Sequence, residues 1–169
     1  MASALVPPSL ACNPTATTIQ KDRAHDMASS IVRIHAYTRS YNVLRPYQQG
    51  GIQKGVGSGV VLDPLLFGTA PGVLYILTCE HVVHEAHDVL VVFPSQGREE
   101  RTATILAVCP HTDLAIIECT TDYAAKALTL GCSDDLGQGN RVRAYGFPLS
   151  QHALKVTDGV YSGYQDRFL

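Results

Sequence analysis

The sequence predicts an all-β protein, in which about six short strands form a β-sandwich or a small barrel and a second, incomplete block of strands follows. Three observations support this fold class. Short apolar segments recur at regular intervals between residues 30 and 118, with turn residues between them. Helical periodicity is nearly absent. Apolar residues make up 46% of the 169-residue chain and charged residues 17%, which is enough apolar material for a core and unlike a disordered chain.

The predicted strands of the first barrel follow one another closely: residues 30–36, 55–63, 73–78, 89–93, 102–108 and 114–118. The first alternates in part between apolar and polar residues. The second opens with Gly55, Gly57 and Gly59 and continues into β-branched residues, whereas the fourth is a continuous apolar run. The apolar positions of these strands and of the next block supply the predicted core: Ile31, Val60, Val61, Ile76, Leu77, Val91, Ile105, Leu114, Ile116 and Val142.

A second block begins after a connector at residues 121–128, which we expect to form a helical turn or two. Residues 141–148 and 154–165 read as strands, the latter as a hairpin around Asp158 and Gly159 or as one bent strand. Two or three strands cannot close a barrel and leave open edges. We therefore divide the chain into a leader, residues 1–28, a first barrel, residues 29–122, and a connector with the start of a second barrel, residues 123–169.

Charge and composition exclude several classes of partner. The net charge is −2 and there is no basic run, so no nucleic-acid partner is expected. No apolar run is long enough to cross a bilayer, so no membrane partner is expected. The five cysteines include no Cys-x-x-Cys pair and favour reduced thiols in an intracellular protein, although the compartment stays unknown. The leader, broken by Pro7 and Pro8, is a poor secretory signal.

Two residues at strand ends, His81 and Asp113, are the candidate catalytic groups. His81 follows the strand at residues 73–78, and Asp113 directly precedes the strand at residues 114–118. Each alone is most often a structural residue. Together they can place a carboxylate against one ring nitrogen of the histidine, which fixes the tautomer and leaves the other nitrogen to accept a proton from a nucleophile.

A metal site is the rival interpretation of the histidines. His81, His84 and His87 are three residues apart, with Cys79 nearby, but on a helix steps of three drift by about 60° each and do not converge. The His-Glu-x-x-His metalloprotease motif is absent. We expect Cys79 to point to the side opposite His81 because strand side chains alternate. The sequence therefore predicts no metal and no organic cofactor.

Three short motifs carry a resemblance to a known family: GVGSG at residues 55–59, TCEHVV at residues 78–83 and TDLA at residues 112–115. In this order and spacing they resemble the trypsin-like serine peptidases, and most closely the HtrA (Deg) branch. The resemblance implies a chymotrypsin-like double β-barrel, the second barrel only partly present here. It also implies hydrolysis of polypeptide substrates by a Ser-His-Asp triad, with His81 as general base and Asp113 as the orienting carboxylate.

Two departures from the family pattern matter. Val82 stands where secreted trypsins have a cysteine, which favours the disulfide-poor HtrA branch. The family's nucleophile lies in a Gly-x-Ser-Gly-Gly loop, and the 169 residues contain no such loop. Other serines are expected in turns or packing positions and not as nucleophiles: Ser58, Ser133, Ser150 and Ser162.

The missing loop leaves two hypotheses. The first is a trypsin-like serine endopeptidase that has no nucleophile in this chain and is inactive as given. The second is a non-catalytic module that keeps the protease fold to bind peptides or a partner protein. In either case an oligomer or a complementing polypeptide is a possible partner, because exposed strand edges invite pairing.

Overall fold

The computed structural model describes residues 27–41, 44, 47, 49–67, 72–123, 125–148 and 151–163. The leader predicted at residues 1–28 lies almost wholly outside these residues. Residues 27–30 form a helical turn that leads into the first strand. Among the described residues, no helix has the length and apolar character needed to cross a membrane.

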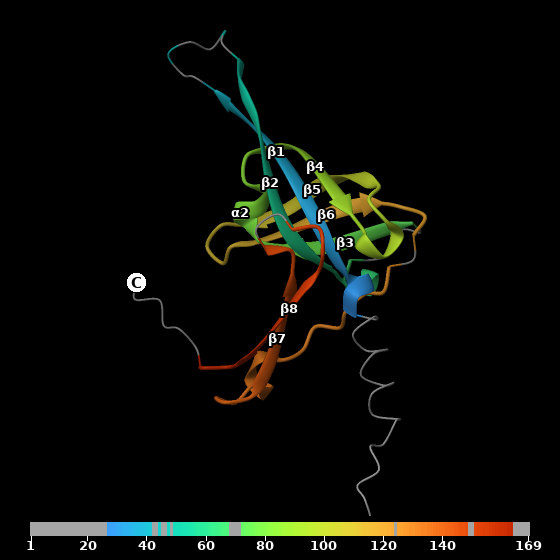
Figure 1. Cartoon of the computed structure of the whole chain (residues 1–169), viewed down its shortest axis with the longest axis vertical. Coiled ribbons are helices and arrows are strands. Elements are labelled where there is room, and N and C mark those ends of the chain that lie inside the picture. The colour runs from blue at the N-terminus through green and yellow to red at the C-terminus, as the bar shows by residue number, and fades with distance from the viewer. Residues whose placement is uncertain are drawn as a thin grey trace, which may run out of the picture.

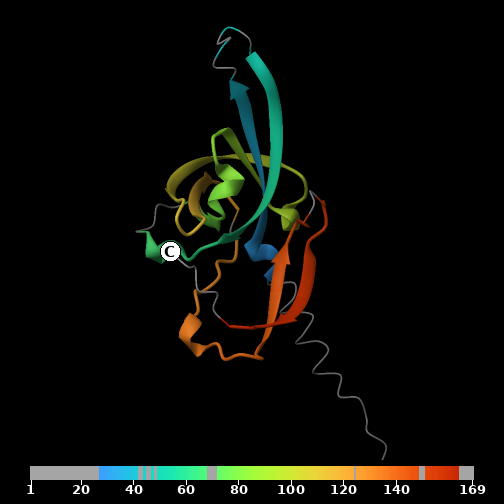
Figure 2. The same cartoon turned by 90° about the vertical axis from the view of Figure 1, so that its left-hand side faces the viewer.

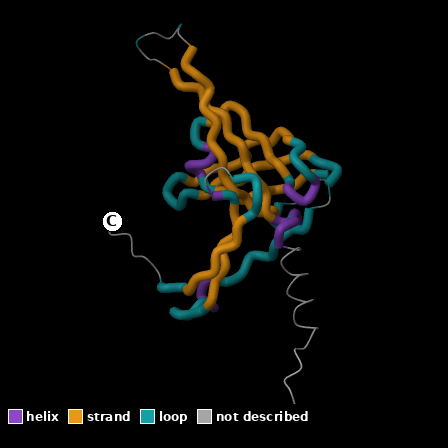
Figure 3. The backbone as a smooth tube through the Cα atoms, in the orientation of Figure 1, coloured by secondary structure: helices purple, strands orange, loops and turns teal. Residues whose placement is uncertain are grey.

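A closed antiparallel barrel with the strand order β1-β2-β3-β6-β5-β4 dominates the structure, as predicted (Figures 1 and 3). β1 and β2 run on past the barrel as a long two-stranded ribbon (Figure 1). The strands have the following bounds: β1 Ile31–Tyr41, β2 Gln49–Val61, β3 Val73–Thr78, β4 Ala86–Val92, β5 Glu100–Cys109 and β6 Leu114–Thr120. Several of them are therefore longer than their sequence patterns indicate.

Short helical segments lie in the connections between strands. The α-helix α2 is a single turn between β3 and β4, and the described residues also contain three 3₁₀ turns. Their bounds are α2 Glu80–Val83, η1 Pro64–Leu66, η2 Pro94–Gln96 and η3 Ser133–Asp135.

Alternation of the side chains along the strands builds the barrel core. On β6, Ala115, Ile117 and Cys119 are buried, while the residues between them are partly or fully exposed. The same period of two on β1 sends Val32 and Ile34 inward. Burial of such side chains is the main favourable term in folding, about 25 cal/mol per Å² of apolar surface.

The predicted core was right in part. Ile31, Val61, Ile76 and Val91 are buried. Leu114 is wrong, because it is 44% exposed on β6. The face of β6 that carries Leu114 also carries Glu118 and Thr120 and points outward, so alternation places Ala115 rather than Leu114 inside. The other predicted core residues are half-buried: Val60, Leu77, Ile105, Ile116 and Val142.

The helical turn predicted at residues 121–128 is also wrong. The described part of this connector contains no helix, and Leu128 forms a parallel bridge with Leu62 of the barrel. Tyr123, Ala125 and Ala127 all pack against the core. Contact at every second residue does not match the period of a helix, so packing on the barrel outweighs the local helical preference of this alanine-containing segment.

The second block forms a two-stranded antiparallel sheet of β7, Arg141–Gly146, and β8, Lys155–Val160. Asp158 and Gly159 lie within β8, so this segment is one strand and not a hairpin. The sheet stands beside the barrel (Figure 2). The backbone N–H of Phe147, a buried residue just after β7, donates to Ser58 Oγ of β2 at 2.8 Å. This partial second sheet confirms the predicted incomplete second barrel.

Candidate active site

The register between β3 and β6 brings the two candidate catalytic residues together. Thr78, the last residue of β3, pairs with Ala115 of β6. His81 comes three residues after Thr78, in α2, and Asp113 two residues before Ala115. Because the strands are antiparallel, the end of one and the start of the other lie at the same edge of the barrel. The backbone N–H of Glu80 donates to the Asp113 carbonyl at 3.2 Å and ties α2 to the turn before β6.

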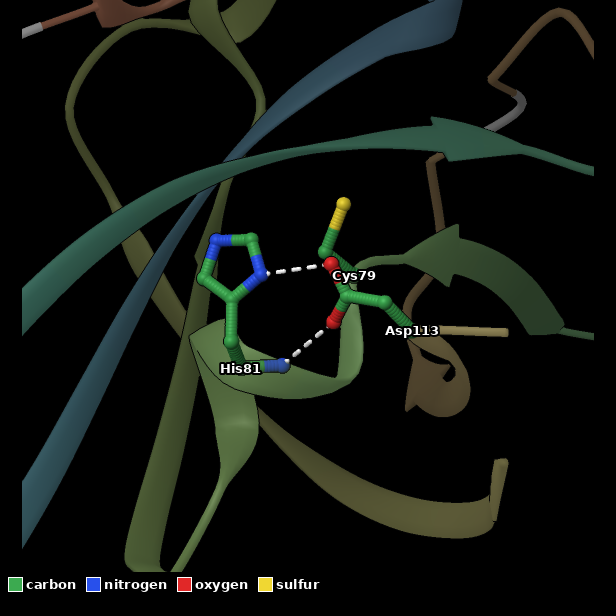
Figure 4. Close-up of side chains that lie close together, drawn as sticks. All are labelled: Cys79, His81 and Asp113. Carbon is green, nitrogen blue, oxygen red and sulfur yellow. Dashed lines mark hydrogen bonds and ion pairs between the residues drawn. The ribbon is translucent and has the colours of Figure 1, made fainter. Parts of the chain in front are cut away.

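Asp113 holds His81 through both carboxylate oxygens (Figure 4). His81 Nδ1 lies 2.7 Å from Asp113 Oδ2, and the His81 backbone N–H donates to Oδ1 at 2.9 Å. An ionised carboxylate can only accept hydrogen bonds, so Nδ1 carries the proton in the neutral ring. Nε2, which faces away from the carboxylate in Figure 4, is then the basic nitrogen. The arrangement orients an imidazole as a proton acceptor.

The hydrogen bonds also fix the charge of Asp113. The His81 backbone N–H, followed by the His81 ring, lowers the pKa of the Asp113 carboxyl below its ordinary value. Each of these donors favours the ionised form. The group is therefore an anion at neutral pH and can stabilise a positive charge on His81.

Backbone strain accompanies this site. Asp113 has φ of 54°, in the left-handed region that non-glycine residues rarely adopt, at a cost on the order of 1–2 kcal/mol. The turn that holds it is closed by backbone bonds from Thr112 N to Cys109 O and from Asp113 N to Pro110 O, both 3.3 Å. Aspartate tolerates this conformation better than most residues, which fits its place at the end of the turn.

Packing of α2 on β2 sets the position of His81. A Cβ atom on Gly57 would lie 2.4 Å from Val82 Cγ1, so only glycine at this position lets α2 approach β2 this closely. On the other side of the turn, Val83 is buried in the core. These two valines anchor α2, while the side chain of His81 points outward and is 68% exposed.

Cys79 lies beside the pair, contrary to the prediction from its sequence position. One ligand atom each from Cys79, His81 and Asp113 lies within 4.8 Å of the others (Figure 4). Strand alternation does not apply here, because β3 ends at Thr78 and Cys79 is already the N-cap of α2. Burial and then the charge of Asp113 raise the pKa of the Cys79 thiol. The thiol is therefore protonated at neutral pH and is a poor nucleophile.

The other residues singled out in the sequence do not join this cluster. His84 Nδ1 lies 2.6 Å from Glu80 Oε1, which raises the pKa of His84. His87 lines a separate cavity of about 240 Å³ with Tyr37 and Asp88. Among the serines, Ser58 accepts the bond from Phe147 described above and has a packing role. Ser150 lies outside the described residues.

Comparison with known proteins identifies the family. Residues 57–168 match the family described as the trypsin-like peptidase domain, which is more than half of the chain. The chain belongs to the trypsin-like peptidase family. Within this family, the similarities below support the HtrA branch that the sequence motifs indicate.

Two serine proteases of Bacillus subtilis (strain 168) resemble the chain in sequence. The Serine protease Do-like HtrA is 35% identical over 112 residues, which cover 66% of this chain and 23% of that protein. The Serine protease Do-like HtrB is 32% identical over 143 residues, which cover 84% of this chain and 30% of that protein. The chain thus spans less than a third of the length of these relatives.

A solved structure supports the same fold. The HtrA-type protease AlgW with tripeptide has a TM-score of 0.62 and 24% identity to this chain, and the alignment covers 85% of this chain and 39% of that one. Together with the closed barrel and the second sheet, this likeness establishes the chymotrypsin-like fold of this trypsin-like peptidase chain.

Proposed function

We propose that this chain supplies the general base, His81, and its orienting carboxylate, Asp113, to a serine endopeptidase. The observation that carries the proposal is the bond of 2.7 Å between His81 Nδ1 and an ionised Asp113 in a trypsin-like peptidase chain. This bond leaves Nε2 as the proton acceptor, which is the role of the histidine in a Ser-His-Asp triad.

The chemistry follows from this geometry. A serine hydroxyl attacks the peptide carbonyl carbon, and its proton passes to Nε2 of His81. Asp113 stabilises the resulting imidazolium, which then gives the proton to the leaving amine. A water molecule deacylates the enzyme by the same route, with His81 again accepting and returning a proton. Side chains and backbone N–H groups suffice for every step, so we propose no cofactor for the reaction.

The nucleophile is the part of the triad that the sequence does not contain. The 169 residues lack a Gly-x-Ser-Gly-Gly loop. We propose that the attacking serine, and the oxyanion hole built by the same loop, come from a longer natural product or from a second polypeptide that completes the second barrel. The coverage of only 23% and 30% of the related proteases supports this proposal. The chain by itself would then be inactive.

Polypeptides are the substrates that we propose. The relatives are described as serine proteases, and the solved HtrA-type protease was obtained with a tripeptide. An extended peptide can bind along an exposed strand edge through main-chain hydrogen bonds.

The test uses the complete natural product and an unfolded protein as substrate. We expect His81→Gln to lower kcat/KM by at least about 10³-fold, because the proton acceptor is lost. His84→Gln is the matched control, since it removes a neighbouring exposed histidine that bonds Glu80 and not Asp113. It should keep hydrolysis within about twofold, as expected for a side chain outside the reacting groups. Hydrolysis that survives His81→Gln would refute the proposal. A product that binds peptides without hydrolysing them would favour the non-catalytic module.

A further inference from the structure

The thiol beside the catalytic pair gives the site a second possible use. Cys79 Sγ, a His81 ring nitrogen and an Asp113 carboxylate oxygen converge from two segments of the chain, and all lie within 4.8 Å of one another. Among the described residues, this is the group of histidine, cysteine and acidic side chains placed closely enough to hold a metal ion. The proposed Ser-His-Asp triad uses the histidine and the carboxylate of this group and has no role for the thiol.

The donor set matches one class of cation. Thiolate, imidazole and carboxylate are the three ligand types that zinc combines, at about 2.3 Å for sulfur and 2.0–2.2 Å for nitrogen and oxygen. Tetrahedral coordination at these bond lengths separates the ligand atoms by about 3.6 Å. Ligand atoms that lie near the 4.8 Å limit therefore have to approach by roughly an ångström, whereas His81 Nδ1 and Asp113 Oδ2, now 2.7 Å apart, have to separate. Small side-chain rotations can supply both changes because His81 and Asp113 are 68% and 40% exposed. Hard cations such as Mg²⁺ and Ca²⁺ prefer oxygen ligands and fit this set less well.

We propose that Cys79, His81 and Asp113 form an inhibitory site for a zinc-like divalent cation. The proposal that these residues bind the cation does not depend on the proposed function. The inhibitory part rests on the proposed function, because it requires His81 to be the general base.

The charges around the thiol favour a cation in this place. The Asp113 carboxylate and the Cys79 sulfur lie within 4.8 Å of each other, so the carboxylate would repel a thiolate at Cys79. A divalent cation between them reverses that repulsion and bonds both groups. The thiol loses its proton to solvent when the Zn–S bond forms, so binding strengthens as the pH rises.

Binding of the metal and catalysis exclude each other for a chemical reason. The ion takes the lone pair of Nδ1, the nitrogen that now donates to Asp113. The proton of Nδ1 has to leave, and a neutral ring bound through Nδ1 carries its proton on Nε2 instead. Nε2 then donates and cannot accept the proton of a nucleophile. The balance is one thiol proton released to solvent and one ring proton moved, through water, from Nδ1 to Nε2.

The first test measures binding to the 169-residue chain, without any activity assay. Zinc affinity is determined by competition with a chromophoric chelator, and Co²⁺ serves as the spectroscopic probe. We expect wild type to show a thiolate-to-cobalt charge-transfer band and Cys79→Ser to lose it. Zinc affinity should fall by at least about tenfold in Cys79→Ser, the low end of the loss seen when groups around a metal are removed. Cys109→Ser is the matched control, since Cys109 is also a free thiol and is more exposed than Cys79.

Any of three results would overturn the binding proposal. Absence of the cobalt band in wild type would do so without any variant, and therefore without any question of folding. Equal zinc affinity in wild type and Cys79→Ser would do so as well, and so would an equal loss in Cys109→Ser, which would indicate non-specific thiol binding. Far-UV circular dichroism of each variant checks that the barrel is folded.

The second test separates inhibition from the proposed function. Hydrolysis by the complete natural product is measured with zinc and after removal of zinc by a chelator, each variant relative to its own zinc-free rate. We expect reversible inhibition of wild type and a requirement for at least about tenfold more zinc in Cys79→Ser. Zinc binding without inhibition would overturn the inhibitory part. If the zinc-free product does not hydrolyse peptides, the proposed function fails while the binding result still holds.

Discussion

At the scale of single residues, Asp113 has the largest number of roles. One oxygen fixes the His81 ring, the other fixes the His81 backbone, and its own carbonyl accepts from Glu80 N. Its left-handed backbone places the carboxylate against α2. Because several donors stabilise the ionised carboxylate in the folded protein, its protonation lowers the free energy of unfolding.

This effect of protonation predicts an acid-dependent loss of stability at Asp113. Its pKa is lowered in the folded protein, so the unfolded chain takes up a proton first as the pH falls. The stabilisation is present above the unfolded pKa of about 3.9 and is lost as the pH falls through the lower, folded value. Urea midpoints from pH 7 to pH 3 should show the difference between wild type and Asp113→Asn shrinking. Asp88→Asn, at another exposed aspartate, controls for net charge, and a constant difference for Asp113→Asn would contradict the prediction.

The buried side chain of His35 should cause a second pH dependence of stability, at a higher pH than that of Asp113. Its side chain is 5% exposed, Nδ1 lies 2.6 Å from Glu100 Oε1, and Nε2 is buried without a partner among the described residues. Burial lowers the pKa of His35, so the unfolded chain binds the proton more readily and stability falls as the pH drops below about 6.5. His35→Gln should flatten the curve of unfolding free energy against pH between 7 and 5. His84→Gln is the control of opposite sign, because Glu80 raises the pKa of His84.

At the scale of elements, the approach of α2 to β2 decides where the histidine stands. α2 is a single turn and cannot be stable by itself, so its position comes from packing. Gly57 provides the room on one side and the core holds Val83 on the other. The glycine-rich start of the second predicted strand therefore has a structural cause.

Gly57→Ala should be destabilising, because its Cβ would meet Val82 at 2.4 Å. We expect a loss of about 1–3 kcal/mol in urea unfolding, the usual cost of overpacking. Gly55→Ala is the matched control, since its nearest neighbour, Ala36 O, is 3.7 Å away. The added Val82→Ala should recover part of the loss, with a coupling free energy above about 0.5 kcal/mol. Additive effects of the two substitutions would show that this contact does not limit the position of α2.

At the scale of the whole molecule, a complete barrel carries a two-stranded sheet beside it. Val156 and Val160 of β8 are 53% and 60% exposed, and a sheet of two strands is marginally stable by itself. The buried Phe147 and its bond to Ser58 Oγ connect this sheet to the barrel. The barrel and the second sheet should therefore unfold with different free energies.

Hydrogen exchange tests this difference. Amides of β7 and β8 should exchange faster than those of β1–β6, because few buried contacts protect them. Ser58→Ala leaves the Phe147 N–H without its acceptor, at a cost of about 1–3 kcal/mol, and should speed exchange in β7 and β8 further. Ser95→Ala, which removes an exposed bond to Tyr123, is the control. Equal protection of both sheets would contradict the expectation.

Features that depend on local interactions could be predicted from the sequence, whereas features that depend on contacts between distant parts of the chain could not. The barrel could be predicted because alternation and turn residues are local, and the motifs indicated His81 and Asp113 as partners. The inward face of β6 was missed because Leu114 and Ile116 are larger apolar residues than Ala115, although Glu118 on their face indicates the outward side. The non-helical connector depends on contacts with the core, and the position of Cys79 depends on the bend that starts α2.

The most direct test of the central claim is the intact mass of the natural product before and after reaction with a serine-reactive fluorophosphonate. We predict a product larger than the 169 residues of this chain, or a stable complex with a second polypeptide. It should gain one probe on a serine outside residues 1–169, and His81→Gln should abolish the reaction. Absence of labelling, or labelling unaffected by His81→Gln, would contradict the assignment of His81 and Asp113 to a serine peptidase triad.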